Sequence, residues 1–550
     1  YNVNEGEKYT INDVDVIGEI PFEEEVYIEI VNSLKDQTYS QAQITSIEEF
    51  FVNVLGNRGY AFAEVKGDTE ITDDSNEVKL IFTVIPGNKT YTRKILFTGN
   101  DVTQDHVLRR EMRQFEGAWT SDNSIEAGKV RLERLGYFKE VNVETIPVVG
   151  TEDQIDIVYS VDEETTGSVG GNIGYSDFGL MLGFNLQEQN FLGSGNTVGI
   201  GINKNIYSEM YNLSFMNPYA TKDGVSLGYN VYFRETDYGE FNVANYLTNS
   251  NGFGAQFGYP TSDITRLGFN VTYDKTDIDV GTLPALEIYD FVSAEGNIFE
   301  TLSVQFSWQR VTLNRGLFPT AGSSTVISLS TTVPGSDLSY YRSSIRQRYY
   351  RPLSSNFVFG FSGELGYLDA YGDTEETPFF QNFYAGGPRS LRGFESNTLG
   401  PRSTDAPCYE FNYEEKTCPN LIDTDGDGEL DSPYINPYAN STSRYRDRPI
   451  GGNIKVEGSM QLIFKLPFIE DQRSLRSAFF FDFGNVFSDN CKDYQINCYK
   501  PALEDLRYSY GVGVTWITGF GPLSLAISKP TNAGPQERTE EFQFTVGNVF

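Results

Sequence analysis

The sequence is poor in histidine, in cationic side chains and in long apolar runs, and each shortage excludes a class of protein. His106 is the only histidine, and no P-loop occurs, so we expect neither an enzyme nor a nucleotide cofactor. Lys and Arg number 42 against 76 Asp and Glu, and the net charge of −34 disfavours nucleic acid, whose phosphates require clustered cations. No run of 18 apolar residues occurs, which excludes a transmembrane helix.

Cysteine is scarce as well, with four residues in two close pairs, Cys408/Cys418 and Cys491/Cys498. Both pairs lie in polar, turn-rich segments without the CxxC spacing of a zinc site, which favours disulfides formed outside the cytoplasm. Three connectivities are possible in principle. The local pairing, Cys408–Cys418 and Cys491–Cys498, closes the smallest loops.

Tyrosine, phenylalanine and glycine are abundant, at 35, 40 and 53 residues, although only 39% of the chain is hydrophobic. This mixture suits strands that face lipid on one side and water on the other. Lipid cannot satisfy unpaired backbone groups, so a membrane protein of this composition has to form a closed β-barrel.

The first 165 residues contain an internal repeat. "VNEGEKYTINDVDVIG" (Val3–Gly18) matches "VIPGNKTYTRKILFTG" (Val84–Gly99). Gly6 and Gly87 are 81 residues apart, and so are Gly18 and Gly99. In each copy a helical pattern ends in Gly-Tyr and two short alternating strands follow, which predicts a β-α-α-β-β unit of about 80 residues that occurs twice. The opening residues read as the interior of a domain, so we expect a piece of a longer mature protein.

From about residue 166 a two-residue alternation replaces the helical periodicity. In "YSYGVGVTWI" the aromatic and aliphatic residues share one face, and serine, glycine and threonine share the other. Small or polar residues inside and apolar residues outside are typical of a transmembrane barrel, whereas the polar face of a soluble sandwich tends toward charge. Sixteen such segments follow, beginning near Ser168, Leu180, Asn196, Met210, Gly224, Asn251, Thr265, Thr301, Ser324, Leu338, Asn356, Asn453, Ser474, Arg507, Gly521 and Glu540. They predict an antiparallel, 16-stranded barrel.

Three further motifs carry a family resemblance: "GGPRSLRGFESNTLGP" from Gly386, "VLRREMRQFEGAW" from Val107 and the ending "FQFTVGNVF". Together with the repeats, which resemble POTRA domains, they resemble the family of the outer-membrane assembly factor BamA along essentially the whole chain. The resemblance implies a fourth POTRA domain at 1–86, a fifth at 87–164, and a barrel at 165–550 with a long extracellular loop 6 at about 373–452. It implies an insertase of the bacterial outer membrane with its POTRA domains in the periplasm.

In that family loop 6 folds into the barrel lumen and carries the motif that is here Leu391, Arg392, Gly393 and Phe394. A guanidinium held away from bulk water requires a carboxylate partner. In "AFFFDFGNV" the phenylalanines at 479, 481 and 483 face lipid, so Asp482 points into the lumen and is the predicted partner of Arg392. The family places a Glu on the preceding strand, where Gln461 stands here and is expected to supply an amide acceptor.

Barrel closure requires the first barrel strand, "SVGGNIGYS", to pair with the last, "EEFQFTVGNVF". The glycines of the first strand weaken this junction, and a poorly paired edge can template an incoming strand. We therefore predict a lateral gate at which nascent β-barrel proteins pair with the first strand. The predicted gate residues are Gly170, Gly171, Gly174, Gln543, Phe544, Gly547 and Phe550.

Two motifs each allow two interpretations. "DTDGDGELD" offers Asp423, Asp425, Asp427 and Asp431 at the spacing of a calcium loop, but Tyr434 replaces the final acidic ligand, so a solvated acidic loop is the alternative. By the resemblance, Glu111 and Arg113 contact an assembly lipoprotein of the BamD kind. The alternative is an ordinary charged helix face.

The resemblance implies four kinds of partner: assembly lipoproteins, periplasmic chaperones, nascent outer-membrane barrel proteins and the lipid itself. Three other functions compete with the insertase. A related exporter of one polypeptide shares POTRA domains and the Arg-Gly-Phe loop, whereas a passive porin lacks the repeats. A calcium-dependent adhesin rests on Asp423–Asp431 alone.

Overall fold

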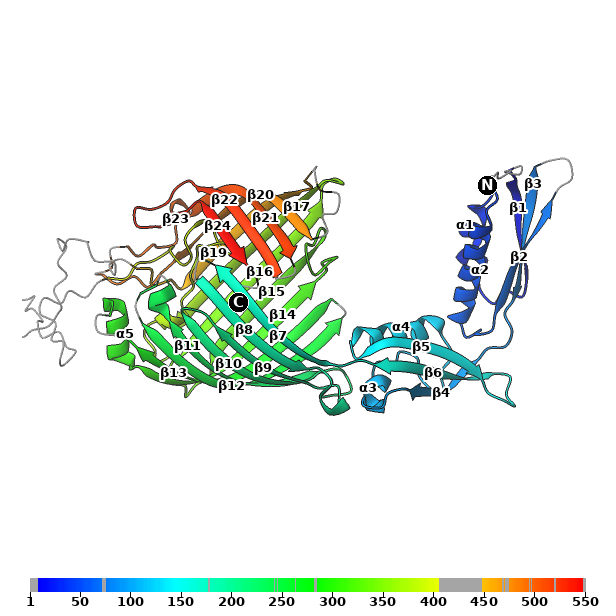
Figure 1. The fold of residues 1–550 in the computed structure, drawn as a ribbon, viewed down its shortest axis with the longest axis horizontal. Coiled ribbons are helices and arrows are strands. Elements are labelled where there is room, and N and C mark those ends of the chain that lie inside the picture. Colours follow the sequence, from blue (N-terminus) through cyan, green and yellow to red (C-terminus); the bar gives the residue numbers. More distant parts are fainter. Residues whose placement is uncertain are drawn as a thin grey trace, which may run out of the picture. The chain divides into compact units, whose positions relative to one another are not determined.

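The computed structural model describes residues 8–71, 76–176, 179–241, 243–244, 246–262, 264–280, 284–404, 448–466, 469, 474–493, 495, 497–518 and 521–547. The predicted Cys408–Cys418 pair, the four aspartates of the calcium motif and Phe550 lie outside these residues. The chain forms two compact units (Figure 1). One consists of residues 1–167 and 189–195, and the other of residues 168–188 and 196–550.

The first unit contains the two predicted β-α-α-β-β repeats. The first repeat has β1 (Thr10–Gly18), α1 (Ile28–Asn32), α2 (Gln41–Gly56), β2 (Glu64–Ile71) and β3 (Glu77–Ile85). The second has β4 (Tyr91–Thr98), α3 (Asp105–Arg109), α4 (Asp122–Arg134), β5 (Phe138–Pro147) and β6 (Gln154–Glu163). Each sheet has the same topology, β1-β3-β2 and β4-β6-β5, in which the first strand runs parallel to the central one and the other outer strand antiparallel.

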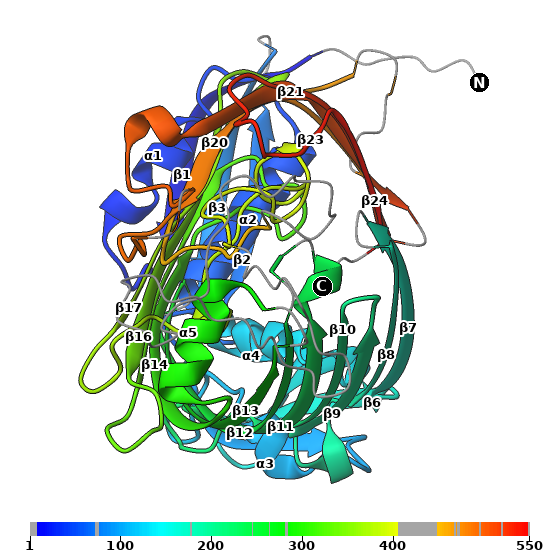
Figure 2. The same ribbon diagram turned by 90° about the vertical axis from the view of Figure 1, so that its left-hand side faces the viewer.

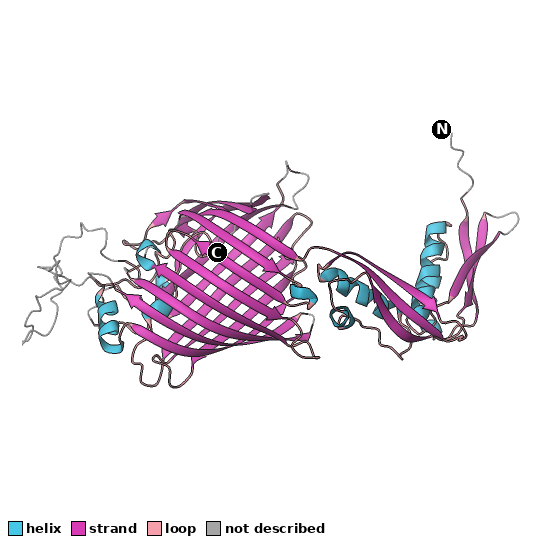
Figure 3. Cartoon of the chain, turned by 60° about the horizontal axis from the view of Figure 1, so that its bottom comes forward, coloured by secondary structure: helices cyan, strands magenta, loops and turns pink. Residues whose placement is uncertain are grey.

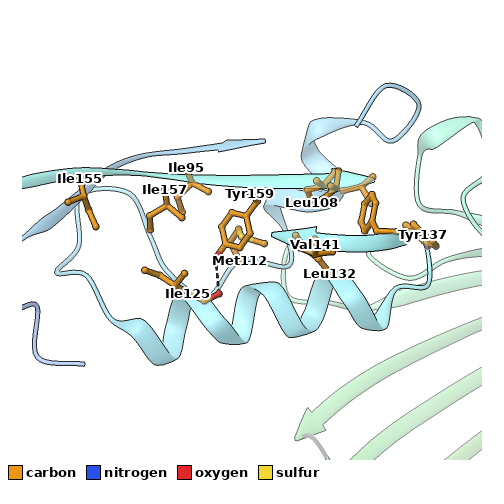
Figure 4. Packing of buried hydrophobic residues seen from close by; sticks show 13 residues of the cluster. Ile95, Leu108, Met112, Ile125, Leu132, Tyr137, Val141, Ile155, Ile157 and Tyr159 are labelled. Atoms are coloured by element: carbon orange, nitrogen blue, oxygen red, sulfur yellow. Dashed lines mark hydrogen bonds between the residues drawn. The ribbon is translucent and has the colours of Figure 1, made fainter. Parts of the chain in front are cut away.

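Both repeats bury one face of the longer helix against the sheet. On α2 the buried side chains recur at helical spacing, as the sequence predicts: Ile44, Ile47, Phe51 and Leu55. In the second repeat α4 packs on apolar side chains of the sheet (Figure 4), and the Tyr159 hydroxyl donates to the Ile125 carbonyl at 2.9 Å. Burial raises the pKa of Tyr159, so this phenol stays protonated.

The aligned glycines Gly18 and Gly99 each lie at the end of the first strand of a repeat, and the backbone conformation there explains why both repeats have glycine. Gly18 and Gly99 have φ of 111° and 83°, the left-handed region that side chains avoid. A Cβ atom would lie 2.1 Å from the Val84 carbonyl oxygen at Gly18 and 2.0 Å from that of Val161 at Gly99. Both strands therefore end in the same close approach to the central strand of the sheet.

The first unit also includes Gln189–Gly195, the segment between β8 (Gly179–Glu188) and β9 (Thr197–Lys204). Its buried Asn190 donates through Nδ2 to Thr103 Oγ1 at 2.8 Å and accepts the Gly195 N–H at 2.7 Å. The Gln104 N–H donates to the Gly193 carbonyl at 2.9 Å. These bonds make the segment an integral part of the second repeat's packing.

The second unit is a closed, antiparallel barrel of 16 strands, which confirms the predicted fold class and strand number (Figures 2 and 3). Every predicted strand start lies within four residues of the observed one. The barrel strands are β7 (Gly167–Ser176), β8 (Gly179–Glu188), β9 (Thr197–Lys204), β10 (Ser208–Asn217), β11 (Ser226–Asp237), β12 (Leu247–Ser262), β13 (Thr265–Asp279), β14 (Ile298–Val311), β15 (Gly322–Thr332), β16 (Tyr340–Pro352), β17 (Phe357–Ala370), β19 (Ile454–Phe464), β20 (Leu475–Phe487), β21 (Arg507–Thr518), β22 (Gly521–Pro530) and β24 (Phe542–Val546).

The remaining elements lie in connections. A two-stranded sheet pairs β18 (Gly393–Phe394) with β23 (Thr539–Glu540), and α5 (Leu286–Glu295) joins β13 to β14. The 3-10 turns are η1 (Glu24–Val26), η2 (Phe191–Gly193), η3 (Tyr238–Phe241), η4 (Phe379–Gln381) and η5 (Leu503–Asp505). Within the described ranges, no helix has both the length and the apolar character needed to cross a membrane.

Side chains alternate between the two faces of the barrel wall. On β20, Phe479 and Phe481 are 51% and 42% exposed, whereas the intervening Phe480 is 4% exposed and Asp482 is fully buried. The exposed face of β20 carries phenylalanines that lipid would cover, and the inner face carries the charged Asp482 together with Phe480. This alternation decides which side chains can meet loop 6.

Candidate functional site

Loop 6 brings Arg392 against the inner face of β20, where it forms the predicted pair with Asp482. Arg392 Nε and Nη2 donate to the two carboxylate oxygens of Asp482, each at 2.7 Å, and the Arg392 backbone N–H donates to Oδ2 at 3.2 Å. The carboxylate is fully buried, and the arginine side chain is 16% exposed. A bidentate, charge-assisted pair of this kind offsets the desolvation of both groups.

An aromatic ring completes the surroundings of the guanidinium. Arg392 Cζ lies 3.4 Å from the centroid of the Phe480 ring, so the cation rests on the ring face. Gly511, the partner of Phe480 on β21, leaves room for this ring, since a Cβ atom there would lie 2.7 Å from Phe480 Cζ. Phe480 was not among the predicted site residues, although it occupies the same inner face as Asp482.

The structure corrects the expected role of Gln461. Arg392 Nη2 donates to Ser459 Oγ at 3.0 Å, and Gln461 only donates to that same oxygen, at 3.3 Å. The reason is strand register: Ser459 on β19 lies directly opposite Asp482, whereas Gln461 lies opposite Phe480. We call Arg392, Asp482, Ser459 and Phe480 the loop-6 clamp.

The rest of the motif anchors loop 6 beside the clamp. Gly393 has φ of 92°, and a Cβ atom there would lie 3.2 Å from Ser528 Oγ and 3.3 Å from Ser509 Cβ, so glycine permits the close approach to the barrel wall. Leu391 and Phe394 are fully buried in an apolar cluster with Leu368, Phe383, Ala385, Leu399 and Val486. Phe394 thus anchors loop 6 through apolar packing.

Loop 6 also contacts the end of the chain. β18 pairs antiparallel with β23, with Gly393 opposite Glu540 and Phe394 opposite Thr539. Gln543 on β24 is 2% exposed, accepts the Gly393 N–H at 3.3 Å and donates to the Phe394 carbonyl at 2.8 Å. The predicted gate residue Gln543 therefore lies against the loop-6 motif.

The barrel closes where β24 meets β7, a junction that we call the seam (Figure 2). Among the described residues the seam has a single partner pair, Val546 opposite Tyr175. On its other side β24 has five partner pairs with β22. Because β24 has five residues and β7 has ten, most of β7 faces no described strand on this side.

The predicted gate residues fall on both strands of this seam. Gly170 and Gly171 are exposed on β7, and Gly174 is buried. Gly547 has φ of 78°, and a Cβ atom there would lie 2.5 Å from the Ile173 carbonyl oxygen. Phe544 is 38% exposed on the outer face.

Asn172, which the sequence analysis did not single out, points inward from β7. Both polar atoms of its amide are buried and find no hydrogen-bond partner among the described residues. Gly183 on β8 makes room for the amide, since a Cβ atom there would lie 2.3 Å from Asn172 Oδ1. A buried amide without a hydrogen-bond partner is unfavourable, so this position does not stabilise the first barrel strand.

The structure also corrects the expected surface around Glu111. Helix α3 ends at Arg109, so Glu111 and Arg113 lie beyond it. Glu111 is buried and accepts a hydrogen bond from Arg131 Nη2 at 2.6 Å, which excludes it from an exposed charged face, whereas Arg113 is exposed. Elsewhere Cys491–Cys498 forms the local disulfide, and the described residues contain no group of three or more potential metal ligands among His, Cys, Asp and Glu.

Comparison with known proteins agrees with this architecture. Residues 190–550 match the Omp85 superfamily domain, and residues 9–87 and 90–164 match the POTRA family described as surface antigen variable number repeat. A solved structure, BamA from Haemophilus ducreyi lacking POTRA domains 1-3, superimposes with a TM-score of 0.79 at 31% identity, covering 98% of this chain and 99% of that chain.

Two curated relatives extend the comparison. The outer membrane protein assembly factor BamA of Neisseria meningitidis serogroup B is 29% identical over 576 residues, covering all of this chain and 68% of the relative. The sorting and assembly machinery component 50 homolog of Bos taurus is 22% identical over 447 residues, covering 78% and 84%. Among four curated BamA relatives, the chain spans between 51% and 68% of their length.

The fold and these matches define an outer-membrane β-barrel protein that carries POTRA repeats. The chain belongs to the BamA family of the Omp85 superfamily. Its homologues support β-barrel assembly and insertion as the function.

Proposed function

We propose that the chain inserts β-barrel proteins into the outer membrane through lateral opening of the seam between β7 and β24. The observation that carries this proposal is the single described partner pair of the seam, Val546 with Tyr175, next to a β22–β24 ladder that has five. In lipid each unpaired backbone N–H or C=O costs several kcal/mol, so an edge of this kind favours any strand that pairs with it.

Strand addition accounts for insertion without a nucleotide cycle. A nascent strand that pairs with β7 satisfies backbone groups on both chains and presents its own free edge to the next strand. The exposed Val169, Ile173 and Tyr175 on the outer face of β7 give such a strand apolar neighbours. Burial of apolar residues in the bilayer and closure of the new barrel then drive the reaction.

The loop-6 clamp supports this mechanism from inside the barrel. Its buried ion pair joins loop 6 to β20, and β18 joins the same loop to the segment before β24. We propose that the clamp keeps the final strands in place while β7 exchanges partners.

The proposal includes partners outside the membrane. Arg113 is exposed and the nearby Phe115 is 71% exposed in the second repeat, so we propose this segment as the contact for an assembly lipoprotein of the BamD kind, with chaperones delivering nascent chains to the repeats. Arg113→Glu should weaken binding of the purified lipoprotein, and Arg134→Glu, on the exposed end of α4, is the control. Equal effects of the two reversals would overturn this contact.

The seam itself is tested by a disulfide between its directly opposed residues, Tyr175→Cys with Val546→Cys. The expected result is loss of insertion of a model barrel protein into proteoliposomes, restored by a reductant. The control joins Val512→Cys to Ile527→Cys, an outer-face pair on β21 and β22, and should insert at the wild-type rate before and after reduction. Wild-type insertion by the sealed seam would contradict the proposal.

A further inference from the structure

Loop 6 and the end of the chain share one small β-ladder inside the barrel. Gly393 and Phe394 of β18 pair with Glu540 and Thr539 of β23, and the Glu395 N–H donates to the Arg538 carbonyl at 3.0 Å. β23 ends at Glu540, two residues before β24 begins. The ladder therefore lies next to the barrel strand that borders the seam.

After β23 the backbone leaves this ladder for the barrel wall. The Glu541 carbonyl accepts the Ser528 N–H of β22 at 2.8 Å, and from Phe542 onward the backbone of β24 pairs with β22. From this point the backbone belongs to the barrel, and any remaining link to loop 6 has to come from side chains.

The Gln543 side chain provides that link. Its Oε1 accepts the Gly393 N–H at 3.3 Å, and its Nε2 donates to the Phe394 carbonyl at 2.8 Å, with a longer contact of 3.4 Å to Glu540 Oε2. The orientation of the amide follows from its partners, because the oxygen faces an N–H and the nitrogen faces a C=O. A side-chain amide thus replaces the peptide group that would continue the β18–β23 ladder.

We propose that Gln543 is a positioning residue that fastens the last barrel strand to loop 6, so that the seam opens by release of β7 while β24 stays in place. The inference rests on the proposed lateral opening. β24 is held by its ladder to β22 and, through Gln543, by a loop whose Arg392 is paired with the buried Asp482. β7 is hydrogen-bonded to β8 on its other side, and the seam itself adds one described partner pair between β24 and β7.

The burial of Gln543 explains why its amide matters. At 2% exposure the side chain has no bulk water as an alternative partner, so loss of either bond leaves a buried donor or acceptor unsatisfied. Gln543→Glu keeps the shape and the acceptor for the Gly393 N–H, but it removes the donor and places a carboxylate against the Phe394 carbonyl. Gln543→Met keeps the volume and removes both bonds, which separates packing from hydrogen bonding.

The test is hydrogen exchange of the full chain in lipid nanodiscs, in the peptides that cover residues 391–400 and 539–547. Both Gln543 variants should speed exchange in the two segments together, by about tenfold or more. The control is Gln305→Glu on the inner face of β14, where the amide oxygen accepts from Asn270 Nδ2 at 3.1 Å, and both segments should then exchange as in the wild type. Unchanged exchange in 539–547, or in both segments, would overturn the proposal.

A second variant tests the same link from the other end. Arg392→Lys keeps the charge but loses the bidentate geometry with Asp482, so it should also speed exchange in 539–547 if loop 6 holds the last strand. Exchange that rises only in 391–400 would contradict the link.

The outcome is separable from that of the proposed function. If Gln543→Glu loosens both segments but a sealed seam still inserts substrate, the link stands and lateral opening fails. If sealing blocks insertion but Gln543→Glu leaves both segments unchanged, lateral opening stands and the link fails.

Discussion

At the scale of single residues, the loop-6 clamp shows how a cation is held inside a barrel wall. Asp482 is fully buried, so its charge depends on Arg392 for compensation. The Phe480 ring and Ser459 Oγ contact the guanidinium in addition to the carboxylate. Removing one member of the ion pair leaves the other charge buried and uncompensated.

The buried ion pair predicts how strongly variants of the loop-6 clamp lose stability. Arg392→Ala should destabilise the barrel by about 3–5 kcal/mol, because it leaves the Asp482 carboxylate buried alone. Ser459→Ala should cost less, about 1.5–3 kcal/mol, because it removes one hydrogen bond to an arginine that keeps its carboxylate. Urea unfolding in detergent, with proteolysis of loop 6 as the readout, measures both losses of stability. Equal losses for the two variants would contradict the central place of the ion pair.

A carboxylate of the second repeat predicts a pH dependence. The Ile95 N–H donates to Glu116 Oε1 at 2.9 Å and Arg109 Nη1 lies 3.1 Å from it, and these contacts lower the pKa of Glu116. Because the pKa of Glu116 is lower in the folded protein, its ionised carboxylate stabilises the fold at pH values above the unfolded pKa of about 4.3. This stabilisation is lost as the pH falls through the folded pKa. Glu116→Gln keeps an acceptor for Ile95 but does not titrate.

The measurement is thermal melting of the repeats by Trp119 fluorescence, in a chain whose other two tryptophans, Trp308 and Trp516, are replaced by Phe. Between pH 6 and 3 the melting temperature should fall more steeply for the chain with Glu116 than for Glu116→Gln. Parallel curves for the two chains would contradict the assignment.

At the scale of elements, each POTRA repeat depends on the close approach between its first strand and its central strand. The structural equivalence of Gly18 and Gly99 extends from the sequence match to the backbone conformation and to the carbonyl that each glycine faces. Substitutions at the two strand ends therefore test the same geometric cause in each repeat.

Gly18→Ala and Gly99→Ala should each destabilise their repeat by more than the about 1–2 kcal/mol that a left-handed conformation costs a non-glycine residue, since both also create a clash with a carbonyl oxygen. Gly117→Ala is the matched control, because Gly117 has φ of 80° but no atom within 4 Å of its Cβ position. Denaturant unfolding of the repeats should rank Gly117→Ala as the mildest change. If Gly117→Ala lowered the stability of its repeat as much as the other two substitutions, the backbone conformation alone would account for the loss of stability.

Much of this architecture follows from periodicity in the sequence, and the exceptions have a common cause. The two-residue alternation predicts the barrel strands and the inward position of Asp482, because every residue of a strand alternates between two faces. Alternation does not give the register between strands, so it could not choose Ser459 over Gln461 as the residue opposite Asp482. Nor could it show the burial of Glu111 or the pairing of β18 with β23, which join segments distant in sequence.

At the scale of the whole molecule, the barrel is closed by a seam at which the described residues of β24 and β7 form one partner pair. The ladder between β21 and β22 has ten partner pairs and that between β22 and β24 has five, whereas the described seam consists of one. The two strands of the seam also differ, because β24 is bonded to loop 6 as well as to β22, while β7 pairs with β8 and presents exposed glycines. The asymmetry predicts that an incoming strand pairs with β7.

The most direct test places a photo-crosslinking residue at successive positions of β7, from Val169 to Tyr175, and on β24 at Phe542 and Phe544, and traps a barrel substrate midway through insertion. The account predicts crosslinks to one substrate strand along β7 with a two-residue period, and few from β24. Crosslinks confined to β24, or spread over both strands without a period, would contradict strand addition at β7.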